Sequence, residues 1–276
     1  MSEGLSIGRF NRLKTLFESK NWDIDDSLEI STFSRFCKTL ESLTEPQQDM
    51  LLKISEKFLH IGQKDYLESL IEPLSCLRKA TEGEMLFFTC CLPQEDIGKC
   101  KSSMTVLYLL KGSTIKTRIG LDPYKTVECF KEETIKYLPK NEKFRIIPVD
   151  DFIGSGETAV AAAEYIKRLA GDKIQNNQIM ILSIVAMQRG VEALDGKGYR
   201  VFSKYICKRG ISDSYDEPLK SEFVAQMWEV ENGIKKLEDK FRFGYQGSEA
   251  LVCMERCPNN TFPIYWRTKG VAPYER

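Results

Sequence analysis

The amino-acid sequence predicts an α/β protein with a doubly wound, mainly parallel sheet and an N-terminal helical region. Two observations support this fold class. After residue 83, uninterrupted apolar runs alternate with segments whose apolar residues recur three and four positions apart. Strands of a parallel sheet are covered by helices on both faces and therefore carry apolar side chains throughout. Earlier residues show only the helical spacing, so we expect a helical region over 1–82 and an α/β domain over 83–276.

Three or four helices are expected in the first region. Residues 31–43 begin with a Ser-Thr pair and continue with apolar residues at helical spacing. Thr44 is a suitable N-cap for a helix over 45–61, and Pro73 is expected to end or kink a helix over 64–80. We interpret the region as a helical cap packed on the α/β domain. A winged-helix-like interaction module is the alternative.

The α/β domain is expected to alternate strands with helices. The apolar runs that predict strands are 84–92, 144–149, 177–187, 199–206, 249–254 and 262–266. The segments that predict helices are 122–138, 156–170 and 221–241. Residues 156–170 are rich in alanine, which suits close packing on a sheet. The state of 104–112 stays open between helix and strand.

Composition excludes several classes of protein. The 276 residues include 40 Lys+Arg and 40 Asp+Glu, so no net charge directs the chain towards a nucleic acid or a membrane. No apolar run approaches the roughly 20 residues of a membrane span, and the N-terminal segment lacks a signal-peptide core, so we expect a cytoplasmic protein. The nine cysteines are scattered and odd in number, which indicates reduced thiols. A single histidine, His60, argues against a Ser-His-Asp triad and a His/Cys metal site.

The most informative motif joins two adjacent carboxylates to a glycine-rich turn, in "FRIIPVDDFIGSGETAVAAAEYI" (144–166). Asp150 and Asp151 are expected at the carboxyl end of a strand, where α/β proteins bind ligands. Gly154 and Gly156 permit positive φ and a close approach of the backbone to a ligand. The amino end of the following helix attracts an anion, whereas paired acids suit vicinal hydroxyls or a divalent cation. A phosphate beside a pair of hydroxyls describes a ribose 5-phosphate.

The stretch "VDDFIGSGET" resembles the signature with which type I phosphoribosyltransferases, a class of glycosyltransferases, bind phosphoribosyl diphosphate (PRPP). The resemblance implies a phosphoribosyltransferase-like fold, a nucleotide-binding site and Mg²⁺ bound together with PRPP. By position, Asp150 and Asp151 would bind the ribose hydroxyls and contact the metal indirectly. The residues implied around the 5-phosphate are Gly154, Ser155, Gly156, Glu157 and Thr158. The family has a small residue, often glycine, where this chain has Glu157, so this carboxylate must point away from the phosphate.

A wider resemblance covers roughly residues 84–269. The segments "EDIGKCKSSMTVLYLL", "VDDFIGSGET", "FGYQGSEALV" and "CPNNTFPIYW" follow one another as in a divergent group of bacterial phosphoribosyltransferase-like proteins of phage-defence and conflict systems. Some members of this group stand beside retron reverse transcriptases. The resemblance therefore implies an effector role in antiviral defence and, as partner, a defence-system protein such as a reverse transcriptase with its DNA/RNA. A homo-oligomer stays open.

Two loops after predicted strands offer further anion contacts. Lys101, Ser102 and Ser103 follow the first strand of the α/β domain, where the family binds pyrophosphate, and a lysine with hydroxyls suits that anion. A solvated polar loop is the alternative. Lys116 and Arg118 could belong to a mobile hood over PRPP or to an ordinary connection.

The segment "CPNNTFPIYW" carries a candidate contact for the base or the acceptor. Asn259 and Asn260 offer amide donors and acceptors, and Tyr265 and Trp266 offer rings for stacking. A rigid structural corner explains the same residues equally well.

Three hypotheses of function compete. The first is transfer or removal of a phosphoribosyl group, with Asp150 or Asp151 orienting the ribose and Lys101 and a cation stabilising the departing diphosphate. The second is a catalytically inactive nucleotide sensor or a protein-binding subunit on the same fold, which Glu157 favours. The third takes Gly154-x-Gly156-x-x-Ala159 as a dinucleotide-binding turn, but the next strand lacks the acid that would hold an adenosine ribose.

Overall fold

The computed structural model describes residues 5–24, 31–140 and 142–276. The chain forms two compact units, Gln63–Cys207 and the combination of Met1–Gly62 with Lys208–Arg276. This division differs from the expected boundary after residue 82. Residues 63–82 belong with the main sheet, and the C-terminal segment shares a unit with the N-terminal helices.

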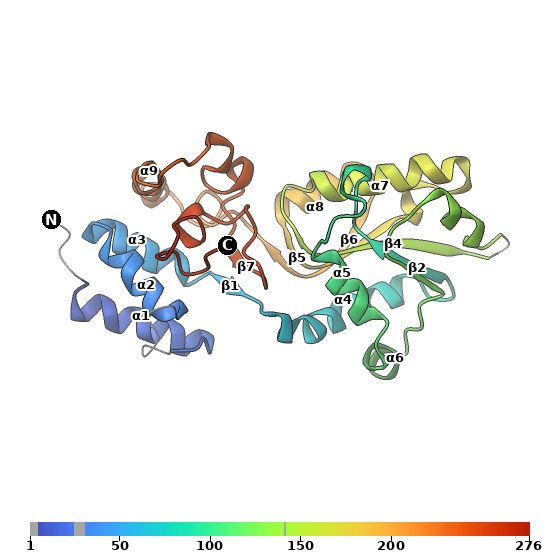
Figure 1. The fold of residues 1–276 in the computed structure, drawn as a ribbon, viewed down its shortest axis with the longest axis horizontal. Helices are drawn as coiled ribbons and strands as arrows, with labels where there is room; N and C mark the ends of the chain where they lie inside the picture. Colours follow the sequence, from blue (N-terminus) through green and yellow to red (C-terminus); the bar gives the residue numbers. More distant parts are fainter. Residues whose placement is uncertain (1–4, 25–30, 141) are drawn as a thin grey trace. The chain divides into compact units, whose positions relative to one another are not determined.

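A five-stranded parallel sheet forms the centre of the unit Gln63–Cys207 (Figure 1). In spatial order its strands are β3 (Lys125–Val127), β2 (Met85–Cys90), β4 (Phe144–Ile153), β5 (Met180–Met187) and β6 (Arg200–Cys207). All four pairings are parallel. Every residue of β5 is buried, as expected for a central strand covered on both faces. The predicted α/β class with a mainly parallel sheet is confirmed.

The order of the strands reverses once, between β2 and β4. From β2 the chain passes to β3 on one side, then returns to β4 on the other side and continues outward through β5 and β6. This is the order of a doubly wound sheet with a switch point between its first and third strands. Connections leave the sheet in opposite directions at such a point, and a crevice opens at the carboxyl ends of the two strands.

Helices cover both faces of the sheet. Figure 1 shows α7 (Glu157–Ala170) and α8 (Gln188–Asp195) on one face, with α4 (Tyr66–Ala80), α5 (Ser103–Leu110) and α6 (Ser113–Ile119) on the other. Four alanines of α7 are buried in one cluster with apolar residues of β4 and β5: Ala159, Ala162, Ala163 and Ala170. Their small side chains let the helix backbone approach the sheet closely, so the start of α7 lies close to the end of β4.

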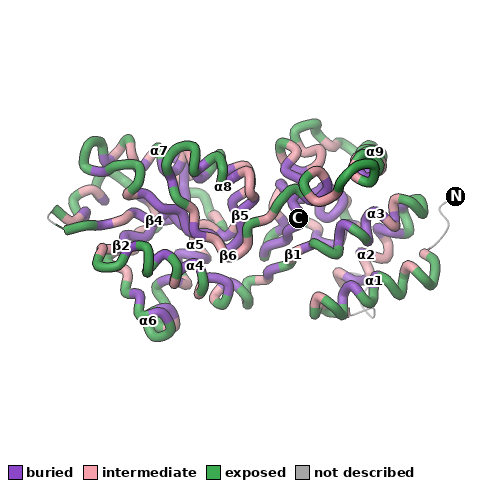
Figure 2. The backbone as a smooth tube through the Cα atoms, turned by 180° about the vertical axis from the view of Figure 1, so that it is seen from behind, coloured by how far each residue is buried: buried purple, intermediate pink, exposed green. Residues whose placement is uncertain are grey.

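The second unit has its own apolar core, visible as buried segments in Figure 2. Its elements are α1 (Ile7–Lys20), α2 (Thr32–Glu41), α3 (Glu45–Ser55), α9 (Leu219–Asn232) and a two-stranded parallel sheet of β1 (Leu59–His60) and β7 (Val252–Cys253). Aromatic side chains dominate this core. The ring centroids of Phe58 and Tyr265 lie 4.6 Å apart, and those of Phe17 and Phe36 lie 5.6 Å apart.

Several expected elements differ from the structure. The helix predicted over 122–138 is wrong: the segment holds the edge strand β3 and a short 3-10 helix at Glu132–Tyr137. Pairing of Lys125–Val127 with β2 overrides the helical spacing of its apolar residues. The open segment 104–112 is largely the helix α5.

Two differences concern the second unit. The strand expected over 262–266 is a 3-10 turn at Pro263–Tyr265, since the proline leaves no amide for a strand partner. The strand within 249–254 does form, but β7 pairs with β1 instead of joining the main sheet. The helix expected over 45–61 ends at Ser55, because Leu59–His60 forms β1, the strand that pairs with β7.

Candidate functional site

The predicted ligand motif lies at the switch point of the sheet. β2 ends at Cys90, and the Cys91 amide makes a last bond of 2.9 Å to the Val149 carbonyl. β4 continues to Ile153, paired on its other side with β5. The acids therefore lie within a strand that extends past its neighbour, and not at the strand's last position as expected. The last four residues of β4, Asp150–Ile153, have no β2 residue in register beside them; this step between the ends of β2 and β4 is called the notch below.

The two adjacent acids have different partners. Side chains alternate along a strand, so Asp150 and Asp151 leave the backbone towards opposite faces of the sheet, but the Asp150 carboxyl bends back to the Asp151 amide and lies within hydrogen-bonding reach of the Asp151 carboxyl. Asp151 is 6% exposed; its Oδ2 accepts a hydrogen bond from the Tyr66 hydroxyl at 2.8 Å and its Oδ1 accepts one from Ser102 Oγ at 2.6 Å. Asp150 is half-buried and is in register with Ser183 of β5. Of the two acids, Asp150 is the more exposed residue.

The charge of Asp150 is poorly compensated. Burial and the adjacent charge of Asp151 raise the pKa of Asp150 well above its usual range, and the charge of Lys101 acts in the opposite direction. One Asp150 oxygen accepts a bond of 3.0 Å from the Asp151 backbone amide. A bound cation or hydroxyl donors would stabilise this carboxylate in its ionised form.

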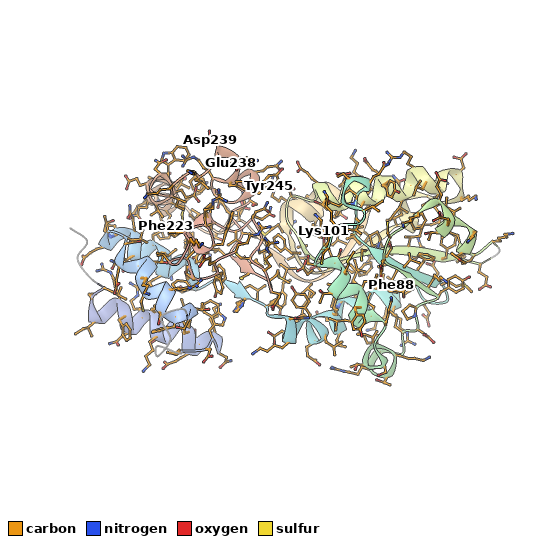
Figure 3. All side chains as sticks on the ribbon, viewed as in Figure 1. Phe88, Lys101, Phe223, Glu238, Asp239 and Tyr245 are labelled. Atoms are coloured by element: carbon orange, nitrogen blue, oxygen red, sulfur yellow. The ribbon has the colours of Figure 1, made fainter. Side chains whose placement is uncertain are left out.

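The loop after β2 contacts Asp151. Ser102 is bonded to Asp151, and Lys101 is close enough for its charge to act on Asp150. Lys101, labelled in Figure 3, pairs at 2.8 Å with Asp96, which also holds Lys99 at 2.8 Å. The third candidate, Ser103, is the first residue of α5 and is 1% exposed. Lys101 is thus placed near Asp150, the hydroxyl of Ser102 is bound to Asp151, and Ser103 is buried.

The glycine-rich turn is seated on α8. Gly156 has φ of 86° and caps α7, a conformation that favours glycine. A Cβ on Gly156 would lie 2.9 Å from the Gly190 carbonyl oxygen, and a Cβ on Gly190 would lie 2.5 Å from the Gly154 carbonyl oxygen. Sequence analysis missed Gly190. The only signal for it was a glycine in "MQRGVE", directly after a buried strand.

The amino end of α7 offers backbone donors. The first intrahelical bond runs from the Val160 amide to the Gly156 carbonyl at 2.8 Å, so the amides before Val160 have no acceptor within the helix. The Glu157 amide makes a long contact of 3.4 Å with Ser155 Oγ. Glu157 and Thr158 are exposed. The positive end of α7 therefore lies next to the notch and can accept an anion.

The residues predicted to contact the base or the acceptor belong to the other unit, and there they form a structural corner. Asn260 is 8% exposed, and its Nδ2 donates to Ser248 Oγ at 3.2 Å. Tyr265 is fully buried, and its hydroxyl is 2.8 Å from Ser55 Oγ. Trp266 Nε1 donates to the Thr261 carbonyl at 2.8 Å. The rings are packed in the core, so the expectation that Tyr265 and Trp266 offer stacking faces is wrong.

The candidate hood residues belong to a helix at another edge of the sheet. Arg118 lies in the last turn of α6 and pairs with Glu68, and Lys116 pairs with Asp122 at 2.7 Å. Arg118 lines a cavity of about 740 Å³ together with Met85 at the amino end of β2. Asp150 lies at the opposite, carboxyl edge. The segment with Lys116 and Arg118 is therefore a helix at the amino edge of the sheet, and not a connecting loop or a hood over the notch.

A resident metal and a membrane segment find no support in the part of the chain that the structure describes. No group of three or more His, Cys, Asp or Glu side chains there is placed to hold a metal ion. None of the described helices is both long enough and apolar enough to span a bilayer.

Comparison with known proteins identifies one family. The model of the family PRTase-CE matches residues 33–275. Among solved structures, an adenine phosphoribosyltransferase from Thermoanaerobacter pseudethanolicus ATCC 33223 is similar at 19% identity over 49% of this chain and 78% of its own, with a TM-score of 0.29. A TM-score this low carries no argument about the site. No curated protein matches the chain.

Proposed function

We propose that this chain, which belongs to the PRTase-CE family of phosphoribosyltransferase-like proteins, binds PRPP or a ribose 5-phosphate nucleotide in the notch between β2 and β4. The observation that carries the proposal is the position of the motif. The half-buried acid, the lysine-bearing loop and the amino end of α7 all lie at the one switch point of the sheet, where such folds bind ligands.

Each group at the notch has a part in binding. Asp150 accepts hydrogen bonds from the ribose hydroxyls, which compensate its unpaired charge. The first-turn amides of α7 receive the 5-phosphate, and Gly156 lets the turn that precedes these amides lie against α8. Lys101 leaves the half-buried Asp96 and pairs with the diphosphate, so one ion pair is exchanged for another.

The reaction that fits these groups is transfer or removal of the phosphoribosyl group. A nucleophile attacks C1 of the ribose, the bond from C1 to the diphosphate breaks, and the electron pair leaves with the diphosphate. Lys101 stabilises the departing charge, and the Asp150 carboxylate offsets the positive charge that develops on the ring.

Mg²⁺ fits the site as a companion of the ligand. Asp150 is one carboxylate at the notch and Asp151 is held by protein donors, so the chain supplies too few ligands for a resident ion. When bound with the diphosphate, Mg²⁺ supplies neutralisation of its negative charge. Asp150 would contact the metal through water.

An effector role in bacterial antiphage defence is part of the proposal, with a reverse transcriptase and its DNA/RNA as candidate partner. It is supported by the resemblance of the segment order to defence-associated proteins. A catalytically inactive nucleotide sensor, or a protein-binding subunit of a defence complex, is the second candidate function. The exposed Glu157 at the amino end of α7 favours it, because a carboxylate there competes with a phosphate.

Calorimetric titration with PRPP, with and without Mg²⁺, tests the proposal, followed by an assay for released pyrophosphate over a panel of bases and nucleotides. We expect Mg²⁺-dependent binding that weakens at least tenfold in Asp150→Asn and is unchanged in Asp172→Asn, an exposed acid after α7. Binding with pyrophosphate release supports the transferase, and binding without release supports the sensor. Absence of binding by the wild-type chain would refute both.

A further inference from the structure

The hydrogen bonds that the Asp151 carboxylate accepts indicate a role different from that of Asp150. Both of its oxygens are occupied by protein hydroxyls, Tyr66 at 2.8 Å and Ser102 at 2.6 Å. Tyr66 is 1% exposed and is the first residue of α4, and Ser102 is the N-cap of α5. Asp151 therefore joins three elements, α4, β4 and the loop before α5, below the floor of the notch.

A ribose has little access to this carboxylate. Asp151 is 6% exposed and points to the face of the sheet that α4 and α5 cover. A ligand hydroxyl would have to reach a remaining lone pair of this covered carboxylate or displace Tyr66 or Ser102, each of which donates to a charged acceptor. Hydrogen bonds of this kind are the stronger ones in proteins, and a buried hydroxyl left without its acceptor is costly. Tyr66 in particular would lose its acceptor inside the core.

The bond from Ser102 fixes the loop that carries the diphosphate contact. Ser102 follows Lys101 directly, so the position of Lys101 depends on where Ser102 is held. Within the loop, Lys101 also pairs with the half-buried Asp96, and Lys101 must leave this pair to meet a ligand. The start of the loop is held at Gln94, which accepts a hydrogen bond from Arg168 of α7, whereas the bond between Ser102 and Asp151 holds the end that carries Lys101.

We propose that Asp151 is a positioning residue, held by Tyr66, that orders the Lys101–Ser102 loop for the diphosphate, and that Asp150 is the acid that recognises the ribose hydroxyls. This inference rests on the proposed function. It assigns a role to Tyr66, which no sequence motif singled out, and it divides two adjacent acids between two tasks.

The first experiment needs no ligand. Hydrogen exchange of the loop amides over 97–106 is measured by mass spectrometry for the wild type, Ser102→Ala and Tyr66→Phe, with Ser75→Ala as a control hydroxyl elsewhere on α4. We expect exchange to rise about tenfold in Ser102→Ala, with a smaller rise in Tyr66→Phe, because one charge-assisted bond is lost in each. Ser102→Thr, which keeps the hydroxyl, should restore protection. Unchanged exchange in Ser102→Ala would overturn the proposed ordering of the loop.

The second experiment separates the two acids by ribose recognition. Affinity is compared for ribose 5-phosphate and 2-deoxyribose 5-phosphate. We expect Asp150→Asn to abolish the preference for ribose, and Asp151→Asn and Ser102→Ala to keep it. Ser102→Ala should also weaken PRPP more than ribose 5-phosphate, since only PRPP carries the diphosphate. Loss of ribose preference in Asp151→Asn, with thermal stability retained, would make Asp151 a direct ligand and overturn the inference. A wild type that binds neither sugar would refute the proposed function, while the exchange experiment still tests the loop.

Discussion

Replacement of Gly190 by alanine is the sharpest test of how the notch is built. An added Cβ at this position would lie 2.5 Å from the Gly154 carbonyl oxygen, 3.0 Å from Ile153 Cγ2 and 3.3 Å from the Gly156 amide nitrogen. Ordinary contacts begin at 3.4 Å, so the turn must move by about 0.9 Å. Two of these neighbours are backbone atoms, which cannot rotate away as the end of a flexible side chain can.

The expected effect has two parts. Overpacking of this kind costs about 1–3 kcal/mol of stability. A displacement near 1 Å at a binding turn lowers affinity or rate by about 100-fold, because the α7 amides no longer face the phosphate together. Thermal unfolding and PRPP titration of Gly190→Ala measure the two parts separately.

Gly196→Ala is the matched control. Gly196 follows the same helix, α8, and a Cβ there would lie 3.3 Å from the Glu192 carbonyl, within a few tenths of an ångström of an ordinary contact. We expect near wild-type stability and affinity. Wild-type PRPP affinity in Gly190→Ala would contradict the proposed seat of the turn on α8.

Three further predictions concern both units. Burial raises the pKa of Glu231 to about 7, so the folded protein favours the protonated carboxyl. The contribution of Glu231 to the free energy of unfolding should be greatest below about pH 4.5 and should fall, by at most about 3 kcal/mol, as pH rises through 7. Urea unfolding at pH 5 and pH 8 should show a smaller difference in Glu231→Gln than in the wild type. Asn260→Ala should lower the free energy of unfolding by about 1–3 kcal/mol and leave PRPP affinity unchanged; a selective loss of affinity would restore Asn260 as a ligand contact. Asp96→Asn should tighten pyrophosphate binding severalfold, because Lys101 no longer exchanges partners, and weaker binding would show that Asp96 orders the loop instead.

The local part of the site could be predicted from sequence because its signals are local. The apolar run before Asp150, the glycines after it and the alanine-rich helix each follow from neighbouring residues, and all three are present in the structure. Gly190 and Tyr66 could not be predicted in this way. Their importance comes from contacts with Gly154 and Asp151, which lie far away in the chain.

At Asn260 the sequence left two alternatives open, a binding surface and a structural corner. Amides, prolines and aromatic rings close together in sequence suggest a binding surface, but the same residue types also close a tight turn over a core. Burial decides between these alternatives, and the spacing of residues does not report it. Tyr265 is fully buried, so its ring contributes to stability and not to recognition.

The location of the site depends on the shortest strand of the main sheet. Without β3 the remaining strands would follow in the order β2, β4, β5 and β6, and the chain would never reverse direction. The helix expected over 122–138 conceals this reversal, because a helix between β2 and β4 is what a simple right-handed crossover requires. Pairing of only three residues, Lys125–Val127, on the outer side of β2 makes the junction of β2 and β4 a switch point. The acids and the glycine turn could thus be identified from sequence, whereas the reason why a ligand should bind between β2 and β4 follows only from the pairing of β3.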